Sequence, residues 1–92
     1  MITIRRLVWD DWNVAHIARH QVVPAEVEQV CHGDHLVRET HHTRLMLIGP
    51  TRRGRMLVII LAPEADDQYY VVTARPADRR ERRLYEQEQR GE

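Results

Sequence analysis

The chain has 92 residues, of which 42% are hydrophobic and 30% are charged, and its formal net charge at pH 7 is zero. This composition is typical of a folded globular protein and excludes a disordered tail, and the length predicts a single domain over residues 1–92. The longest apolar run, Met56–Pro63, is too short to span a bilayer, and no signal peptide is recognisable. The lone Cys31 excludes an intramolecular disulfide, and we expect a cytoplasmic protein.

The zero net charge conceals two local clusters of arginine, the only basic residue besides histidine in the chain. Arg52, Arg53 and Arg55 lie together without an acid among them, and residues 75–83 carry five arginines against two acids. Local basic clusters on a neutral protein indicate phosphate contacts at a defined site rather than general attraction to nucleic acids.

The N-terminal third predicts one strand and two helices. Thr3–Val8 alternates as a short strand does, and Asp10 or Asp11 is a suitable N-cap for a helix that ends at Arg19 or His20. Pro24, at a position where a first helical turn tolerates proline, begins a second helix that continues to Val30.

Helical periodicity assigns the faces of these two helices. In the first helix it places the apolar side chains Val14, Ile17 and Ala18 on the core face and four others on the opposite face: Trp12, Asn13, His16 and His20. In the second helix the predicted apolar stripe consists of Val23, Val27, Val30 and Cys31.

The remaining two thirds, after a turn at Gly33-Asp34, predict four successive strands and a third helix. The strands are Leu36–Glu39, Thr43–Ile48, Met56–Leu61 and Gln68–Ala74, and their connections are His41-His42, Pro50–Gly54 and Pro63–Asp67. Connections this short favour an antiparallel meander. A capped segment without breakers, Asp78–Glu88, predicts the helix. The order β-α-α-β-β-β-β-α predicts an α+β domain with the helices against one face of the sheet.

Three blocks of the sequence together resemble the BrnT type of bacterial toxin. They are the opening VWDD…HIARHQVVPAEVEQV, the central RLMLIG…RGRMLVIIL and the closing VVTARPADRRERRLYE. The resemblance implies a compact RelE-like ribonuclease fold, cleavage of RNA, and a cognate antitoxin partner encoded beside the toxin. That antitoxin would carry a DNA-binding domain, and the two proteins could form a higher-order assembly.

The chain departs from the family pattern at three places. Gln21 replaces the glycine that usually follows the histidine at the end of the first helix, and His16 replaces an asparagine four residues before that histidine. His41, His42 and Thr43 stand where acidic residues commonly precede the arginine that matches Arg44. These departures leave open a second hypothesis, a catalytically inactive module of the same fold that uses its arginines to contact a protein partner.

Cleavage of RNA by its own 2′-hydroxyl requires a base, an acid and cations that stabilise the phosphorane. Histidine suits the proton transfers and arginine the phosphate. His20, which matches the family histidine, is the first catalytic candidate, and the others are Glu39 as a general base with Arg44 and Arg75 as phosphate ligands. If the meander is right, Arg44 and Arg75 could converge on the sheet surface. The ordinary alternative for each is a solvated charge or, for His20, a favourable contact with the helix dipole.

The predicted RNA contacts come from the arginine clusters and one tyrosine, namely Arg52, Arg53, Arg55, Tyr70, Arg79 and Arg82. Tyr69 and Tyr70 alternate across a strand, so only one of them can face the site. We interpret the two tryptophans, Trp9 and Trp12, as core or helix-packing residues rather than platforms for bases.

The histidines also allow a metal hypothesis. His16 and His20 are four residues apart on one helical face, and further ligands could come from Cys31, His32, His35, His41 and His42. Because no recognised ligand motif accompanies them, we expect neither a metal site nor another cofactor.

Overall fold

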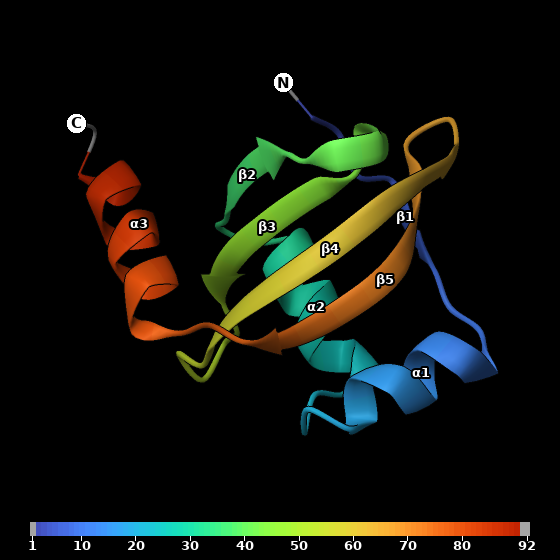
Figure 1. Cartoon of the computed structure of the whole chain (residues 1–92), viewed down its shortest axis with the longest axis horizontal. Coiled ribbons are helices and arrows are strands. Elements are labelled where there is room, and N and C mark those ends of the chain that lie inside the picture. The colour runs from blue at the N-terminus through green and yellow to red at the C-terminus, as the bar shows by residue number, and fades with distance from the viewer. Residues whose placement is uncertain (1, 91–92) are drawn as a thin grey trace.

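The structure, a computed structural model, describes residues 2–90 and has the predicted α+β element order (Figure 1). In chain order the elements are β1 (Arg6–Val8), α1 (Asp11–Ala18), α2 (Pro24–Cys31), β2 (Leu36–Glu39), the 3-10 helix η1 (His41–Thr43), β3 (Leu45–Pro50), β4 (Met56–Ala65), β5 (Gln68–Pro76) and α3 (Arg79–Gln89). No helix within residues 2–90 is long and apolar enough to cross a membrane.

The sheet has the strand order β1-β5-β4-β3-β2. The predicted antiparallel meander is confirmed, since β2, β3, β4 and β5 pair in sequence. β1 adds a fifth strand, parallel to β5, and its register pairs Leu7 with Tyr69. β1 is shorter than the predicted Thr3–Val8 and covers only the first part of β5, so the later part of β5 forms an edge of the sheet.

The helices cover both faces of the sheet, which corrects the prediction that they share one face. In Figure 1, α2 lies behind β3 and β4. The main core packs α1 and α2 against one face and consists of Leu7, Ile17, Val22, Val27, Val30, Cys31, Leu45, Leu47, Leu57, Ile59, Leu61, Val71 and Ala74. A smaller cluster under α3 occupies the other face and consists of Leu36, Ile48, Val58, Ala77 and Tyr85. The alternation of β3 and β4 residues between the clusters, both apolar, explains why neither strand has a polar face.

The predicted face of α1 is wrong at three positions. Val14 and Ala18, assigned to the core face, are exposed (Val14 to 38%), whereas Asn13, assigned to the opposite face, is fully buried with Ile17. The reason is a tertiary contact: the Asn13 amide donates hydrogen bonds to the carbonyl oxygens of Val8 (3.0 Å) and Val71 (3.1 Å). The buried amide thus satisfies backbone acceptors where β1 leaves β5, and its position turns Trp12 outward.

Several predicted boundaries are also corrected. Val23 precedes α2 as its N-cap and is 53% exposed, so it does not belong to the buried stripe. β3 begins at Leu45 rather than Thr43, because residues 41–43 form η1. The β4–β5 hairpin is longer than predicted and turns at Asp66-Asp67, with Asp67 at a φ of 56°. A register shift beside Pro63 accommodates the proline within β4.

Candidate functional site

The two arginine clusters, which are distant in sequence, meet at one end of the sheet. There β3 ends, β4 begins and β5 ends, with Pro50 paired to Met56 and Leu57 paired to Pro76. The Ala77 amide donates to the Met56 carbonyl at 2.9 Å, which joins the start of α3 to the same end. We call this region the Arg75 end; its predicted phosphate ligands and RNA contacts are Arg52, Arg53, Arg55, Arg75, Arg79 and Arg82.

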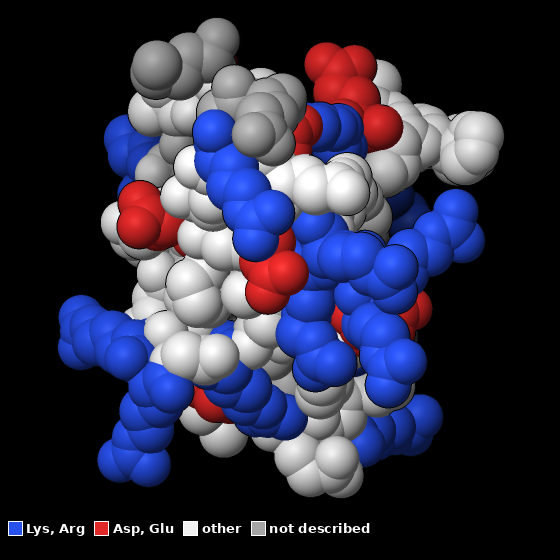
Figure 2. Space-filling model, turned by 90° about the vertical axis from the view of Figure 1, so that its left-hand side faces the viewer, with Lys and Arg blue, Asp and Glu red and all other residues white. Residues whose placement is uncertain are grey.

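The Arg75 end is strongly charged on its surface. Arg52, Arg53, Arg79 and Arg82 are exposed, and within residues 2–90 none of them forms a side-chain ion pair. Figure 2, which views the molecule from the α3 side, shows many arginine side chains over this face with acidic side chains between them. The exposed guanidinium groups are therefore available to phosphates.

His20 reaches the Arg75 end because α1 runs beside β5 in the same direction (Figure 1). Successive contacts join the two elements. The Tyr70 hydroxyl donates to the Asp10 carboxylate at 3.0 Å, the Asn13 amide bonds to Val71, and His16 Nε2 lies 3.1 Å from Thr73 Oγ1. His20, just after α1, therefore lies beside the last part of β5, the part that carries Arg75.

The outward side of α1 carries a row of three rings. The Trp12 and His16 rings are stacked, with centroids 4.8 Å apart and an angle of 7° between their planes. The His16 and His20 rings meet edge to face at 5.8 Å. His16 and His20 are half-buried, whereas Trp12 is exposed. We call Trp12, His16 and His20 the α1 ring row. Of the two roles expected for Trp12, the core role is thus wrong, because the ring is exposed and stacks on His16 of its own helix. Trp9 is confirmed as a packing residue, and it also donates to Glu28 at 2.9 Å.

Arg55 holds the turn that carries His20. Its Nη1 donates to the Gln21 carbonyl at 2.6 Å and to both Glu26 carboxylate oxygens at 3.0 and 3.1 Å, and its Nη2 donates to the His20 carbonyl at 3.4 Å. Gln21 has a φ of 58°, a left-handed conformation that glycine adopts at lower cost. The Arg55–Glu26 pair therefore fixes a strained turn, and the predicted role of Arg55 in binding RNA stays untested.

Arg75 is also held, by an acid at the start of α3. Its Nη1 and Nη2 donate to the two carboxylate oxygens of Glu81 at 2.8 and 2.7 Å. The Arg75 side chain remains 42% exposed, whereas that of Glu81 is 18% exposed. The hydrogen bonds from Arg75 lower the pKa of Glu81, and in return Glu81 raises the pKa of Arg75. Glu81 belongs to the capping box of α3 with Asp78, so the pair ties the guanidinium to a helix start.

The structure does not bring Glu39 and Arg44 to this place. They lie where β2 ends and β3 begins, with Glu39 paired to Leu45. We call this region the Glu39 end. Leu45 pairs with Leu61, whereas Arg75 pairs with Val58, so Arg44 and Arg75 are separated by two strand spacings and more than three residues of β4. This amounts to at least about 14 Å between their backbones, so the expected convergence of the two arginines is not observed.

Side-chain alternation separates these residues further. Glu39 is on the same face of the sheet as Leu45, its partner in the α1–α2 core. The extended Arg44 precedes Leu45 and is on the opposite face, the face that also carries Arg75. Tyr70, at the start of β5, is the tyrosine on this face, whereas Tyr69 packs against the main core. Desolvation raises the pKa of the Tyr70 hydroxyl, and so do the hydrogen bond to Asp10 and the negative charges of Asp10 and Glu64.

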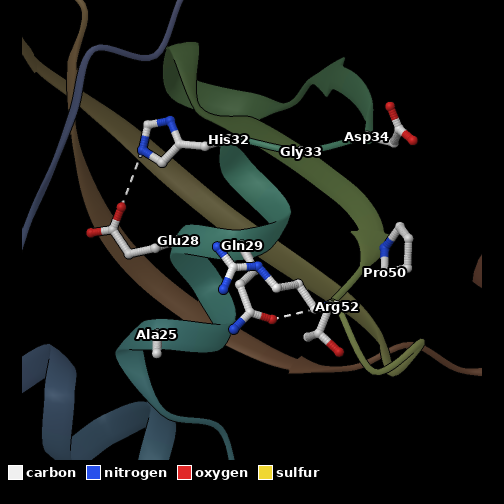
Figure 3. Close-up of a pocket in the computed structure, with 9 residues that line it drawn as sticks. Ala25, Glu28, Gln29, His32, Gly33, Asp34, Pro50 and Arg52 are labelled. Atoms are coloured by element: carbon white, nitrogen blue, oxygen red, sulfur yellow. Dashed lines mark hydrogen bonds and ion pairs between the residues drawn. The ribbon is translucent and has the colours of Figure 1, made fainter.

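A separate cleft of about 680 Å³ lies between α2 and the β3–β4 turn (Figure 3). His32 Nε2 lies 3.1 Å from the Glu28 carboxylate there, and the Arg52 amide donates to the Gln29 side chain at 2.9 Å. The cleft has none of the three rings of α1. Cys31, close by in sequence, is buried, and this burial raises the pKa of its thiol to about 12, which makes the thiol unreactive.

No group of three or more His, Cys, Asp or Glu side chains within residues 2–90 is arranged to hold a metal ion. His16 and His20 do share a helical face, as their spacing predicts, but their ring contact is edge to face and His16 faces Thr73. His41 and His42 lie in η1 at the Glu39 end, away from α1. The structure thus does not assemble the histidines of the metal hypothesis.

Sequence reasoning missed three residues of this region. The sequence favours a core or helix-packing role for Trp12, and it makes neither His16 nor Thr73 a catalytic or RNA-binding candidate. The i, i+4 spacing of Trp12, His16 and His20 was the available signal, since residues four apart are neighbours on a helix surface. Thr73 gave no signal, because its partner His16 is 57 residues away in sequence.

Comparison with known proteins supports the fold. No protein-family model matches the chain, and no curated protein sequence matches it. Among solved structures, the chain is similar to the ribonuclease toxin BrnT of Brucella abortus, with 25% sequence identity and a TM-score of 0.66. The match covers 84% of this chain and all of the BrnT chain. The resemblance that the sequence indicates is therefore confirmed: this is a BrnT-like α+β protein.

Proposed function

We propose that the chain is an endoribonuclease toxin that cleaves RNA without a metal and is neutralised by a cognate antitoxin. The observation that carries this proposal is the position of His20 at the Arg75 end, in a chain whose fold is similar to that of a ribonuclease toxin. An imidazole for proton transfer and guanidinium groups for a phosphate are the two kinds of group that the reaction needs.

In the proposed reaction, His20 takes the proton of a ribose 2′-hydroxyl, and the 2′-oxygen attacks the adjacent phosphorus. The bond from phosphorus to the 5′-oxygen breaks, and that oxygen leaves with a proton from a second acid. The His16 ring, 5.8 Å from that of His20, is the nearest imidazole for this second transfer. The products are a 2′,3′-cyclic phosphate and a 5′-hydroxyl end.

Arg75 is the proposed ligand of the phosphorane. Glu81 occupies one edge of its guanidinium, which fixes the orientation of the group while 42% of the side chain stays exposed. A cation held in place before the reaction stabilises the negative charge that develops in the transition state without further reorganisation. Arg52, Arg53, Arg79 and Arg82 then contact neighbouring phosphates, and Arg44 and Tyr70 contact RNA farther along the same face of the sheet.

A cleavage assay tests the catalytic part of the proposal. The purified protein is incubated with labelled RNA in excess chelator, and the ends of the products are identified. We expect cyclic phosphate and 5′-hydroxyl ends from the wild type. Absence of cleavage, or activity that returns only with added metal, would contradict a metal-independent ribonuclease.

The antitoxin is tested by expression. Induction of the chain alone should stop growth and degrade RNA, and coexpression with the neighbouring gene should prevent both effects. We expect the two proteins to purify as a complex whose association is sensitive to salt, because the exposed arginines attract an acidic partner. Separate elution of the two proteins at modest salt would count against the partner.

One observation favours the second hypothesis, a catalytically inactive binding module. Both Arg55 and Arg75 are already engaged by carboxylates, those of Glu26 and Glu81, and such pairs are also common in purely structural roles. Under this hypothesis the chain binds its protein partner but leaves RNA intact and growth unaffected. The same two experiments therefore separate the hypotheses.

A further inference from the structure

Trp12 is an exposed aromatic side chain that stacks on a neighbouring ring. Its residue is 58% exposed, yet the ring is not loose, because the His16 imidazole stacks on it at a centroid distance of 4.8 Å and an angle of 7°. His16 is itself half-buried and fixed to β5 through Thr73. The indole is thus exposed at the surface while its ring stacks on a side chain that is itself anchored to the sheet.

A small hollow of about 110 Å³ lies beside this stacked pair, lined by Trp12, Ala15, His16 and Arg19. Arg19 is exposed, and its guanidinium forms no ion pair or side-chain hydrogen bond within residues 2–90. The hollow is therefore lined by an indole that is stacked on an imidazole and by an exposed guanidinium group, with the small side chain of Ala15 between them.

This combination has a specific chemical match. A nucleobase has a flat π-face that stacks on an aromatic ring, and its phosphate is an anion for arginine. We propose that Trp12, His16 and Arg19 form a binding site for one unpaired nucleotide of RNA, with the base on Trp12 and the phosphate on Arg19. The site rests on the proposed function, since the α1 ring row leads directly from it to His20.

Such a site requires the RNA to be single-stranded where it contacts Trp12. In a duplex each base is paired and stacked on its neighbours, so its face is not available to Trp12. Stacking is tolerant of sequence because every base has a π-face, so the site selects for strand state rather than for one base.

Binding is measured separately from cleavage with a fluorescently labelled oligonucleotide of about ten 2′-O-methyl nucleotides. This probe lacks the attacking hydroxyl and cannot be cleaved by the proposed route. Anisotropy titrations compare the wild type with Trp12→Ala, Trp12→Phe and, as a matched control, Val23→Ala, which removes another exposed apolar side chain outside the hollow. Melting curves establish that each variant is folded.

We expect Trp12→Ala to bind the single strand on the order of tenfold more weakly, Trp12→Phe to recover most of the affinity, and Val23→Ala to bind as the wild type does. The same oligonucleotide in a duplex should not distinguish Trp12→Ala from the wild type. Unchanged single-strand affinity of Trp12→Ala, equal losses for single strand and duplex, or failure of the wild type to bind would each overturn the site. Loss of a protein partner with RNA affinity intact would overturn it too and identify a protein interface.

Failure of this inference is distinguishable from failure of the proposed function. Cleavage of unmodified RNA by the wild type tests the ribonuclease, whatever the result with the methylated probe. Cleavage together with unchanged affinity of Trp12→Ala would overturn only the nucleotide site.

Discussion

The two ends of the sheet contain similar residue types, but their side chains are held by neighbouring groups at one end and are exposed at the other. At the Arg75 end, Arg55 and Arg75 each donate to both oxygens of a carboxylate, and His20 is held through its carbonyl. At the Glu39 end, Glu39 and Arg44 are exposed, and η1 contains His42 and Thr43 in the left-handed region, at φ values of 61° and 62°.

This difference separates positioned charges from merely accessible ones. A catalytic group works best when its supporting contacts fix it before the substrate arrives. Two carboxylates, Glu26 and Glu81, supply such contacts at the Arg75 end, whereas the arginine at the Glu39 end is free to follow a flexible ligand. We therefore expect substitutions of the held residues at the first end to affect chemistry and stability, and substitution of Arg44 at the second end to affect RNA binding alone.

The largest effect is expected for His20→Ala. If His20 transfers the proton, its loss should lower the cleavage rate by about 10²–10⁴, the usual contribution of a general acid or base. The matched control is His41→Ala, an exposed histidine at the Glu39 end, which should cleave at the wild-type rate. Equal rates for the wild type and a folded His20→Ala variant would remove His20 from the mechanism.

Arg75→Ala should be nearly as severe in rate and should also affect the fold. Loss of one preorganised donor to a transition state commonly costs about 10²–10³ in rate. Because the substitution also breaks the two-pronged pair with Glu81, we expect a loss of about 1 kcal/mol in the free energy of unfolding. Arg75→Lys keeps the positive charge but loses the planar guanidinium with its paired donors. Intermediate activity would therefore show how much of the effect of Arg75 comes from its charge and how much from its geometry. If Arg75→Ala cleaves RNA at nearly the wild-type rate, the Arg75–Glu81 pair has a structural role only.

Arg55→Ala should act mainly through stability. It removes a donor from the Gln21 and His20 carbonyls and the charged donor from the Glu26 carboxylate, which keeps its bond from the Val23 amide. Charged hydrogen bonds of this kind are worth about 2 kcal/mol. We expect a clear fall in melting temperature, with a loss of cleavage that follows displacement of His20. Arg53→Ala, an exposed neighbour in the same turn, should melt as the wild type does and bind RNA more weakly.

Adding Gln21→Gly to Arg55→Ala sharpens this result. Glycine relieves the cost of the left-handed φ at position 21, so the turn depends less on Arg55. Partial recovery of cleavage in the double variant would support a positioning role. No recovery, together with an unchanged melting temperature for Arg55→Ala, would instead favour a direct contact of Arg55 with RNA.

The fold was largely predictable because its signals are local. The caps Asp10 and Asp78, the proline at the start of α2 and the short connections all lie within a few residues of the elements that they define. The face of α1 was not predictable, because Asn13 is buried by its hydrogen bond to Val71, 58 residues away. The faces chosen by α1 and α3 likewise depend on strand alternation in a sheet that is apolar on both sides.

The candidate site was predictable in its residue types and only partly in its arrangement. The two arginine clusters and His20 were identified from the sequence, and the structure brings them to one end. Arg55 pairs with Glu26, which is 29 residues away in sequence. Arg75 pairs with Glu81 because the start of α3 folds back toward β5. Pairings of this kind become visible only in three dimensions, and so does the separation of Glu39 from Arg75.

The Arg75–Glu81 pair predicts a modest pH dependence of stability. The pKa of Glu81 is lowered in the folded chain, so its stabilising contribution is complete above the unfolded value of about 4.3 and is lost as the pH falls through the folded value. The difference in unfolding free energy between the wild type and Arg75→Ala should therefore shrink between pH 7 and pH 3. Denaturant-induced unfolding at both pH values measures this difference. A difference that stays constant would mean that Arg75 does not lower the pKa of Glu81.

The smallest effects are expected at the Glu39 end. Arg44 is on the same face of the sheet as Arg75 but at least about 14 Å away, so it can contact only a different phosphate of the same strand. Arg44→Ala should weaken RNA binding a few-fold and reduce the dependence of affinity on salt by about one counterion, because each lost phosphate contact lowers that slope. The cleavage rate at saturating RNA should stay unchanged. Glu39→Gln, on the opposite face, should alter neither quantity. A large loss of the saturated rate in either variant would show that chemistry occurs at the Glu39 end and would reverse the comparison between the two ends.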